Sequence, residues 1–170
     1  MLRRNLEAAR RHGFESACHP YDFIYRYVLG HPRFGGIQPA VDYYFDDGAR
    51  SAKKLEQIVA KLNIKEEPVR IFEFAFGYGC VIRHLKKNPA FSVVACDIHA
   101  QAIKFIRNKI GVETILSAPV PEDFYLKEKV DVVFALSFFS HMPKSTFGRS
   151  IKVLFSQLKC PATLCLPRTD

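Results

Sequence analysis

Two features that would place the chain in a membrane or in a disulfide framework are missing from its sequence. No apolar run reaches the roughly 18–20 residues that span a bilayer, and the longest, residues 130–139, is interrupted by Asp131 and Ser137. The five cysteines form no C-x-x-C pair, which argues against the common zinc motifs and a disulfide framework. Scattered cysteines of odd number are typical of reduced thiols, so we expect a cytoplasmic protein without a membrane partner.

The chain also lacks internal repeats, low-complexity segments, a P-loop and a Ser-His-Asp pattern. Its 170 residues are 48% hydrophobic and 25% charged, as in a single soluble domain. Lysine and arginine outnumber aspartate and glutamate by 25 to 17, for a net charge of +8. Nucleic acid is therefore an alternative partner. The basic residues are scattered, however, and form no arginine-rich tract with interleaved aromatics, which favours an ordinary solvated surface.

The sequence divides into two zones near residue 48. Residues 1–48 are rich in aromatics and turn formers, and we expect a helical and loop extension that covers the functional site. From 49 to 170, strand and helix patterns alternate. The apolar runs predict strands over 69–75, 92–96, 113–116, 130–136 and 162–166. Apolar residues at helical spacing predict helices over 49–62, 79–87, 99–109 and 147–158. Such alternation is typical of an α/β doubly wound fold with a parallel sheet.

Two residues mark expected helix ends. Asp47 stands where an N-cap would begin the helix over 49–62, because its carboxylate can accept hydrogen bonds from the free amides of the first turn. Gly111 stands where a left-handed residue would end the helix over 99–109.

The segment 71–80 is the most informative about function, because it forms the predicted turn between the first strand and the following helix. Gly77 and Gly79 lack Cβ atoms, so the backbone can bend sharply and approach a ligand. Glu73 lies four residues before Gly77, at the strand end, where a carboxylate can meet a ligand ammonium. Asp97 ends the next strand, 20 residues after Gly77, where an acid accepts hydrogen bonds from ribose hydroxyls.

A nicotinamide dinucleotide would use the same aspartate but a different glycine pattern. The motif G-x-G-x-x-G would need glycines near Ala75, Gly77 and Cys80, and only Gly77 matches. The observed order, acid-x-small-x-Gly-x-Gly, favours a methyl-donor nucleoside instead. Simpler roles remain open for the two acids. Asp97 could merely cap the next helix, and Glu73 could be a solvated strand end.

Three stretches resemble consecutive motifs of the bacterial class I S-adenosylmethionine-dependent methyltransferases: FEFAFGYGCVIRHL, VVACDIHAQAIKFI and VDVVFALSFFSHMP. The resemblance covers about residues 40–166. It implies a Rossmann-like sheet of five parallel strands in the order 3-2-1-4-5, normally completed by a hairpin of two further strands. It also implies S-adenosylmethionine as the cofactor and methyl transfer to an acceptor, which we expect to be a small molecule or glycan-like.

The same resemblance implies a set of cofactor-binding residues. We expect no metal site, because no zinc-ligand pattern is visible in the sequence. Around the methionine moiety it places the residues of the glycine bend: Glu73, Ala75, Gly77, Tyr78 and Gly79. Around the nucleoside it places residues after the second and third strands: Asp97, Ile98, Ser117 and Ala118. The pocket would be closed by residues at the end of the fourth strand and in the upstream segment YYFDDGARSA: Leu136, Ser137, Tyr44 and Gly48.

Several alternatives stay open. His141 either acts as a catalytic base near neutral pH or is a structural histidine, and Phe76 either fills part of the cleft or points into the core. After residue 160 the sequence lacks the family's glycines and stops before the last two strands, so we expect an incomplete sheet without the hairpin, whose open edge could pair with a partner. A truncated or inactive module for cofactor binding or protein interaction, and an RNA methyltransferase, are therefore the alternatives to a small-molecule enzyme.

Overall fold

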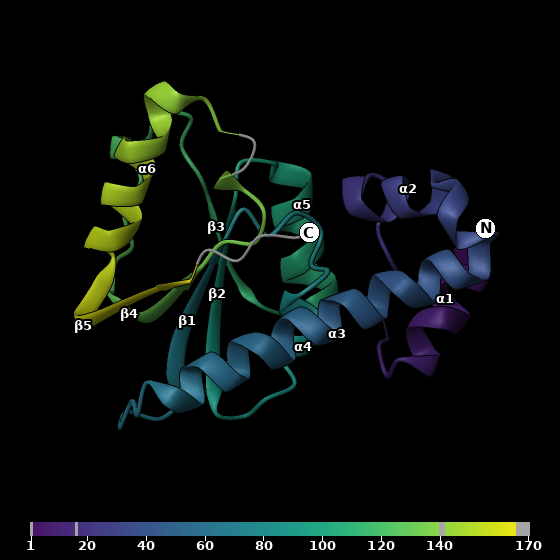
Figure 1. Cartoon of the computed structure of the whole chain (residues 1–170), viewed down its shortest axis with the longest axis horizontal. Helices are drawn as coiled ribbons and strands as arrows, with labels where there is room; N and C mark the ends of the chain where they lie inside the picture. Colours follow the sequence, from purple (N-terminus) through teal and green to yellow (C-terminus); the bar gives the residue numbers. More distant parts are fainter. Residues whose placement is uncertain (1, 16, 140–141, 166–170) are drawn as a thin grey trace.

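The computed structural model describes residues 2–15, 17–139 and 142–165 (Figure 1). Five strands form one parallel sheet in the order β3-β2-β1-β4-β5. Their bounds are β1 Val69–Phe74, β2 Phe91–Asp97, β3 Glu113–Leu116, β4 Val130–Phe134 and β5 Leu158–Cys165. The predicted α/β fold and its strand order 3-2-1-4-5 are confirmed.

Helices cover both faces of this sheet (Figure 1). They are α1 Leu2–Arg11, α2 Phe23–Gly30, α3 Ile37–Lys61, α4 Ile82–Leu85, α5 Ala100–Phe105 and α6 Lys144–Ser156. Single turns are η1 Pro32–Phe34, the π-helical η2 Ile106–Ile110 and η3 Pro121–Asp123. Because neighbouring strand residues point to opposite faces, Ile71 packs on the α3 and α4 side while Phe72 packs on the α6 side. In the described part of the chain, no helix combines the length and apolar character needed to cross a membrane.

The predicted start of the first long helix at Ala49 is wrong. α3 begins at Ile37, and Asp47 is an interior residue whose carboxylate lies 3.1 Å from the Arg50 guanidinium rather than an N-cap. The boundary drawn at residue 48 therefore falls inside one continuous helix. A buried stripe runs along its whole length: Ala40, Val41, Tyr44, Phe45, Gly48, Ala52, Leu55 and Val59. The amino half of this stripe is covered by α1 and α2, a contact that no local pattern reveals.

Smaller differences occur at other helix ends. α4 covers only residues 82–85, and α5 passes into the π turn η2 at Ile106. Leu158 begins β5 rather than ending the preceding helix. Gly111 adopts the left-handed conformation, with φ of 72°, and its N–H donates to the Ile106 carbonyl at 2.8 Å, so its predicted role at the helix end is confirmed.

The amino-terminal helices are fastened by buried polar contacts. The Asn5 side chain donates to the Cys18 carbonyl and accepts from the Cys18 N–H, both at 3.0 Å. Asp22 caps α2 by accepting from the Tyr25 N–H at 3.0 Å, and its other oxygen accepts from the Tyr44 hydroxyl at 2.6 Å. These bonds tie residues 5–25 to α3 and set α2 beside the carboxyl ends of the strands.

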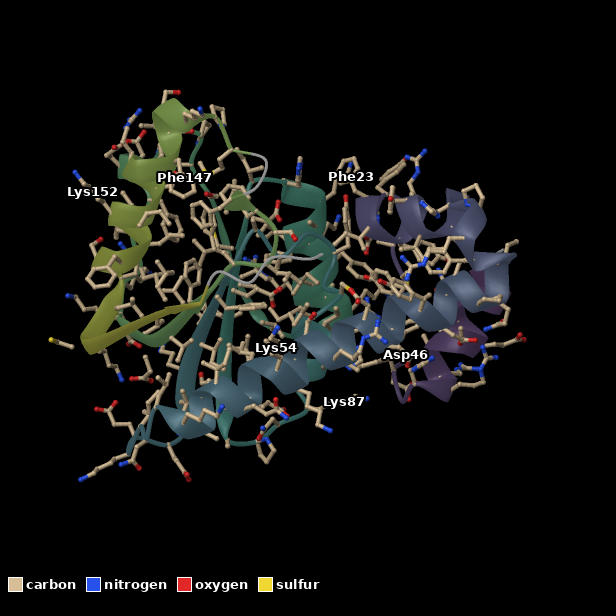
Figure 2. The ribbon with its side chains drawn as sticks, viewed as in Figure 1. Phe23, Asp46, Lys54, Lys87, Phe147 and Lys152 are labelled. Carbon is tan, nitrogen blue, oxygen red and sulfur yellow. The ribbon has the colours of Figure 1, made fainter. Side chains whose placement is uncertain are left out.

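Basic side chains are distributed over several elements. The exposed Lys54 lies on α3, Lys87 follows α4 and Lys152 lies on α6 (Figure 2). This placement agrees with the expectation of a scattered basic surface.

Gly48 brings α3 against the glycine bend, and we expect its replacement by alanine to lower the free energy of unfolding by about 2–3 kcal/mol. A Cβ atom at this position would lie 2.1 Å from the backbone oxygen of Cys80, which cannot rotate away. Gly148 in α6 is the matched control, because a Cβ there meets nothing within 4 Å. Gly148→Ala should instead gain about 0.5–1 kcal/mol from helix propensity.

Urea unfolding followed by circular dichroism measures both variants. Equal shifts of the same sign in the two variants would contradict the close approach of α3 to Cys80.

Candidate functional site

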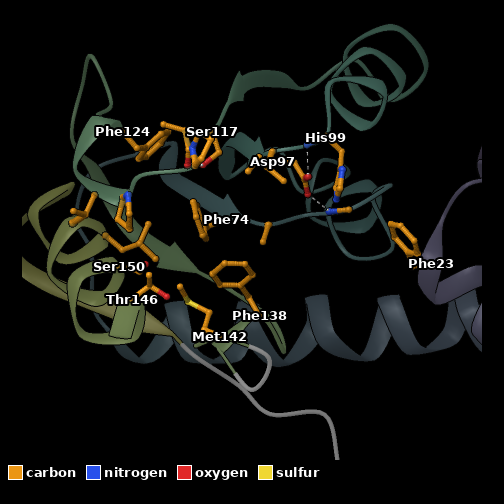
Figure 3. Close-up of a pocket in the computed structure, with 18 residues that line it drawn as sticks. Phe23, Phe74, Asp97, His99, Ser117, Phe124, Phe138, Met142, Thr146 and Ser150 are labelled. Carbon is orange, nitrogen blue, oxygen red and sulfur yellow. Dashed lines mark hydrogen bonds between the residues drawn. The ribbon is translucent and has the colours of Figure 1, made fainter. Parts of the chain in front are cut away.

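A cavity of about 340 Å³ lies at the carboxyl ends of the strands (Figure 3). Its walls come from the ends of β1 and β2, the loop after β3, η3, the loop after β4 and α6, with Phe23 of α2 at one end. Six of the residues that the sequence predicts as cofactor-binding line it: Ala75, Gly77, Asp97, Ile98, Ser117 and Ala118. Open α/β sheets bind ligands at this edge, where the strand order reverses.

The glycine bend after β1 is strained in the way a close backbone approach requires. Ala75 and Gly77 have φ of 59° and 60°, and Gly79 has φ of 85°. The space around the Gly77 Cα is open, so a ligand can approach its backbone. Gly79 has a packing role instead, because a Cβ there would lie 2.5 Å from the Ile106 side chain of η2. Gly77 therefore faces the cavity, whereas Gly79 allows the helix behind it to pack.

Asp97 connects the bend to the second strand. One carboxylate oxygen accepts from the Gly77 N–H at 2.8 Å, and the other accepts from the His99 N–H at 2.9 Å (Figure 3). The residue is only 4% exposed, yet it lines the cavity. Asp97 thus does serve the turn that leads into α5, but the same carboxylate also stands in the cavity wall with lone pairs that a hydroxyl ligand can use.

Glu73 lies beneath the bend and does not line the cavity. It is 3% exposed, so the alternative of a solvated strand end is wrong. Its Oε2 has no hydrogen-bond partner. Burial raises the pKa of its carboxyl to about 8, and the negative charge of Asp97 adds to this rise. Glu73 is therefore a buried, largely neutral acid with an uncommitted oxygen next to the bend.

The nucleoside side of the cavity contains the predicted residues after β2 and β3. Ile98 is 52% exposed, an unusual state for an isoleucine, and it lies on the cavity wall directly after Asp97. Ser117 and Ala118 line the cavity from the loop after β3, and the Ser117 N–H donates to the Asp97 carbonyl at 2.8 Å. The chain thus brings the ends of β2 and β3 together around one space.

Two aromatic residues of the bend point away from the cavity. The Phe76 side chain packs in the core beside Ala95 and Ala102, which settles its alternatives in favour of the core. Tyr78 is buried, and its ring stacks on His19 with 4.4 Å between the centroids.

The remaining predicted residues do not line the cavity. Leu136 packs on the core under α3, and Ser137 is half-buried with a left-handed φ of 54°. Tyr44 is completely buried and donates to Asp22, and Gly48 contacts Cys80, so the upstream segment supports the bend from behind. His141 lies outside the described residues. The described residues hold no group of three or more histidine, cysteine or carboxylate side chains suited to a metal ion.

Twelve of the eighteen residues that line the cavity are not among the predicted site residues; three of these, His99, Pro119 and Pro121, directly follow or lie near predicted ones. The other nine are mostly aromatic or aliphatic and come from five segments: Phe23, Phe74, Phe124, Phe138, Met142, Thr146, Ser150, Val153 and Leu154. Part of a signal exists in α6, where Thr146, Ser150 and Leu154 recur every four residues and so share one helix face. The others are far apart in the chain, and only the packing of η3 and α6 on the sheet brings them together.

Comparison with known proteins places the fold. No protein-family model and no curated protein matches the sequence. Among solved structures, an S-adenosylmethionine-dependent methyltransferase from Clostridium acetobutylicum superposes with a TM-score of 0.57 at 15% identity, covering 68% of this chain and 48% of that one. DesVI from Streptomyces venezuelae gives a TM-score of 0.60 at 16% identity, with 72% and 51% covered. An amino pentose methyltransferase from Micromonospora echinaspora, solved with S-adenosylmethionine bound, gives 0.59 at 15% identity, with 75% and 51% covered.

The chain therefore has the Rossmann-like fold of S-adenosylmethionine-dependent methyltransferases, and it spans about half the length of the structures it matches. Identities this low establish the fold, while the chemistry has to be argued from the cavity itself.

Proposed function

We propose that this chain binds S-adenosylmethionine in the cavity and takes part in methyl transfer to a small-molecule or glycan-like acceptor. The observation that carries the proposal is the Asp97 carboxylate, held in the cavity wall by the amides of Gly77 and His99. Both amides fix the carboxylate in place, so it is preorganised to accept hydrogen bonds from two neighbouring hydroxyls.

The residues present fit the adenosyl and methionine parts of the cofactor. Asp97 would accept the ribose hydroxyls, and the exposed Ile98 would pack on the adenine. The uncommitted Oε2 of Glu73, beneath the bend, suits the ammonium of the methionine moiety, since a buried acid without a partner gains most from an incoming cation. When bound, S-adenosylmethionine supplies an electrophilic methyl group on its sulfonium sulfur.

The chain's own part in catalysis would be positioning. Gly77 lets the ligand approach the backbone, and Asp97 fixes the nucleoside relative to the bend. Holding two reactants in line removes most of the entropic barrier to a bimolecular reaction. The hydrogen bonds from backbone amides to Asp97 keep this geometry rigid before any ligand arrives.

The acceptor class is supported by the neighbours in fold. The matched structures include an amino pentose methyltransferase, a glycopeptide N-methyltransferase solved with S-adenosylmethionine, and coclaurine N-methyltransferase. All three named enzymes act on small or glycan-bearing molecules according to their names, which favours the same class here.

Isothermal titration calorimetry with S-adenosylmethionine and S-adenosylhomocysteine tests cofactor binding. We expect dissociation constants on the order of 10 μM, about −7 kcal/mol, and no heat with NAD as the control nucleotide. Absence of heat with both methionine-derived ligands at about 100 μM protein would count against the proposal, as would equal binding of NAD.

A further inference from the structure

The cavity wall contains no lysine or arginine among the described residues, although the chain carries a net charge of +8. Its only acidic side chain is that of Asp97, which already accepts two backbone N–H groups. The imidazole of His99 lies in the wall at the Phe23 end. A phosphate or carboxylate that enters beside Phe138 and α6 loses its hydration without gaining a lysine or arginine as counter-charge. The described cavity wall therefore offers no lysine or arginine to pair with an anionic group on the acceptor.

One cation of α6 next to a cavity residue is already paired on the outside of the helix. Arg149, next to the cavity residue Ser150, donates from Nε to the Glu122 carboxylate at 2.7 Å, so its charge is compensated there. The polar groups that α6 contributes to the cavity are the hydroxyls of Thr146 and Ser150. Hydroxyls complement uncharged donors and acceptors on a ligand, and they cannot neutralise an anion.

Phe138 lines the cavity from the loop after β4. β4 pairs directly with β1, so the loop after β4 lies beside the glycine bend after β1. The Phe138 ring lies in this loop on the cavity wall and meets Phe74 edge to face, with 5.0 Å between the ring centroids (Figure 3). It also contacts Phe139, with 5.3 Å between the centroids. These contacts pack the Phe138 ring against two other aromatic side chains, and the ring adds apolar surface to the cavity wall.

A second aromatic side chain stands at the other end. Phe23, on α2, lines the cavity close to His99, with 6.0 Å between the ring centroids (Figure 3). It is 67% exposed, although phenylalanine is usually buried in a folded protein. An exposed ring on a cavity rim gains free energy when a second apolar ring covers it.

From these observations, and resting on the proposed cofactor site, we infer that the acceptor is an electrically neutral molecule with an apolar ring that packs against Phe138, with Phe23 as its second aromatic contact. Nucleic acid, phosphorylated sugars and free carboxylic acids are disfavoured as the part of the acceptor that enters the cavity. The net positive charge of the chain thus lies on surfaces other than the site wall.

Matched naphthalene probes test the inference by fluorescence titration of the protein saturated with S-adenosylhomocysteine. The probes are neutral 2-naphthol, anionic 2-naphthoate and doubly anionic 2-naphthyl phosphate, which share one ring and differ in charge. We expect 2-naphthol to bind about tenfold more tightly than either anion, a difference of about 1.4 kcal/mol. Equal or tighter binding of the anions, or no binding of 2-naphthol at millimolar concentration, overturns the inference.

Two variants locate the ring. Phe138→Ala and Phe23→Ala should each weaken 2-naphthol about fivefold, as expected for loss of one aromatic contact, and should weaken S-adenosylhomocysteine by a smaller factor. Phe23 is largely exposed, so its variant keeps the test valid if Phe138→Ala does not fold. Phe147→Ala is the control, since this ring on α6 is 43% exposed and lies outside the cavity wall. A loss of S-adenosylhomocysteine affinity in Phe138→Ala equal to the loss for 2-naphthol would assign the ring to the nucleoside and overturn the inference.

Failure of the proposed function has a different signature. If S-adenosylhomocysteine does not bind, the cofactor proposal fails. The same fluorescence titration without S-adenosylhomocysteine then still compares the affinity of the empty cavity for 2-naphthol with its affinity for the two anions.

Discussion

Replacing Glu73 by glutamine is expected to raise the free energy of unfolding of the unliganded protein at pH 8 by about 3–4 kcal/mol. The carboxyl is buried with one oxygen unpartnered, and this burial, together with the charge of Asp97, raises its pKa from 4.5 to about 8. Between pH 4.5 and pH 8 the unfolded chain has released this proton while the folded chain still holds it. Wild-type stability therefore falls as pH rises through this window, whereas neutral glutamine removes the fall.

Urea unfolding at pH 5 and pH 8 measures this effect. The difference in the free energy of unfolding between wild type and Glu73→Gln should be small at pH 5 and large at pH 8. Glutamine is neutral at both values, whereas burying Glu73 in its neutral form costs free energy only where the unfolded chain would release the proton. Glu113→Gln is the control, since that side chain is 62% exposed at the sheet edge. A stability difference that stays constant with pH would show that Glu73 is not a buried acid with a raised pKa.

The same substitution should weaken S-adenosylmethionine binding while it stabilises the fold. If the ammonium of the ligand meets the Glu73 carboxylate, binding draws the proton off this acid, and affinity rises with pH between about 6 and 7.5. Glutamine offers no charge, so we expect a loss of about tenfold or more at pH 7.5 and a flat pH profile. Titration calorimetry over that range provides the measurement, and wild-type affinity independent of pH would contradict the contact.

Asp97→Asn is expected to weaken S-adenosylhomocysteine binding by about 100-fold or more, corresponding to about 2.7 kcal/mol. The carboxylate accepts from the amides of Gly77 and His99, and an asparagine side chain has only one oxygen with which to accept. One of the two N–H groups would then face the asparagine NH₂ group and lose its bond. The ribose hydroxyls would lose a charged acceptor at the same time.

The stability of the same variant separates these two losses. An unsatisfied, mostly buried N–H should lower the free energy of unfolding by about 1–3 kcal/mol, which urea unfolding without ligand detects. Asp123→Asn on the exposed turn η3 is the control and should change neither quantity. Retention of full cofactor affinity in Asp97→Asn would remove the observation on which the proposed function depends.

The two acids thus have opposite effects on the unliganded protein. Glu73 lowers stability at neutral pH because its oxygen has no partner, and Asp97 raises it because both of its oxygens accept backbone N–H groups. A buried group that destabilises the free protein is typical of a functional site, where a ligand supplies the missing partner. The contrast explains why both carboxylates can belong to one site although only Asp97 lines the cavity.

Local features of the structure could be predicted from contiguous residues. The five strands and the glycine bend follow from apolar runs and from residues 73–79, because strand period and backbone bending depend on near neighbours. Gly111 ends its helix for the same reason, and Asp97 follows β2 at the expected distance from Gly77. The resemblance to a known family supplied the strand order, and the structure confirms it.

Two predictions made from local sequence were wrong: the start of α3 and the place of Tyr44. The amino half of α3 was predicted to be part of a helical and loop extension because turn formers gather there: Gly35 and Gly36 precede the helix, and Pro39 lies in its first turn. Its aromatic residues are helical because α1 and α2 bury them, and this contact connects segments far apart in the chain. Tyr44 was expected at the cofactor for its place in a motif, but its hydroxyl is committed to Asp22.

The sequence alone determined the alternation of strands and helices, the bend and the two acids at its side, because these features depend on residues close together in the chain. Only the tertiary structure decided that Phe76 points into the core, that Glu73 is sealed from water, and that the cavity wall is free of lysine and arginine in the described residues. These properties depend on which distant side chains share a volume. Burial and electrostatic environment arise from that packing, so no linear pattern specifies them.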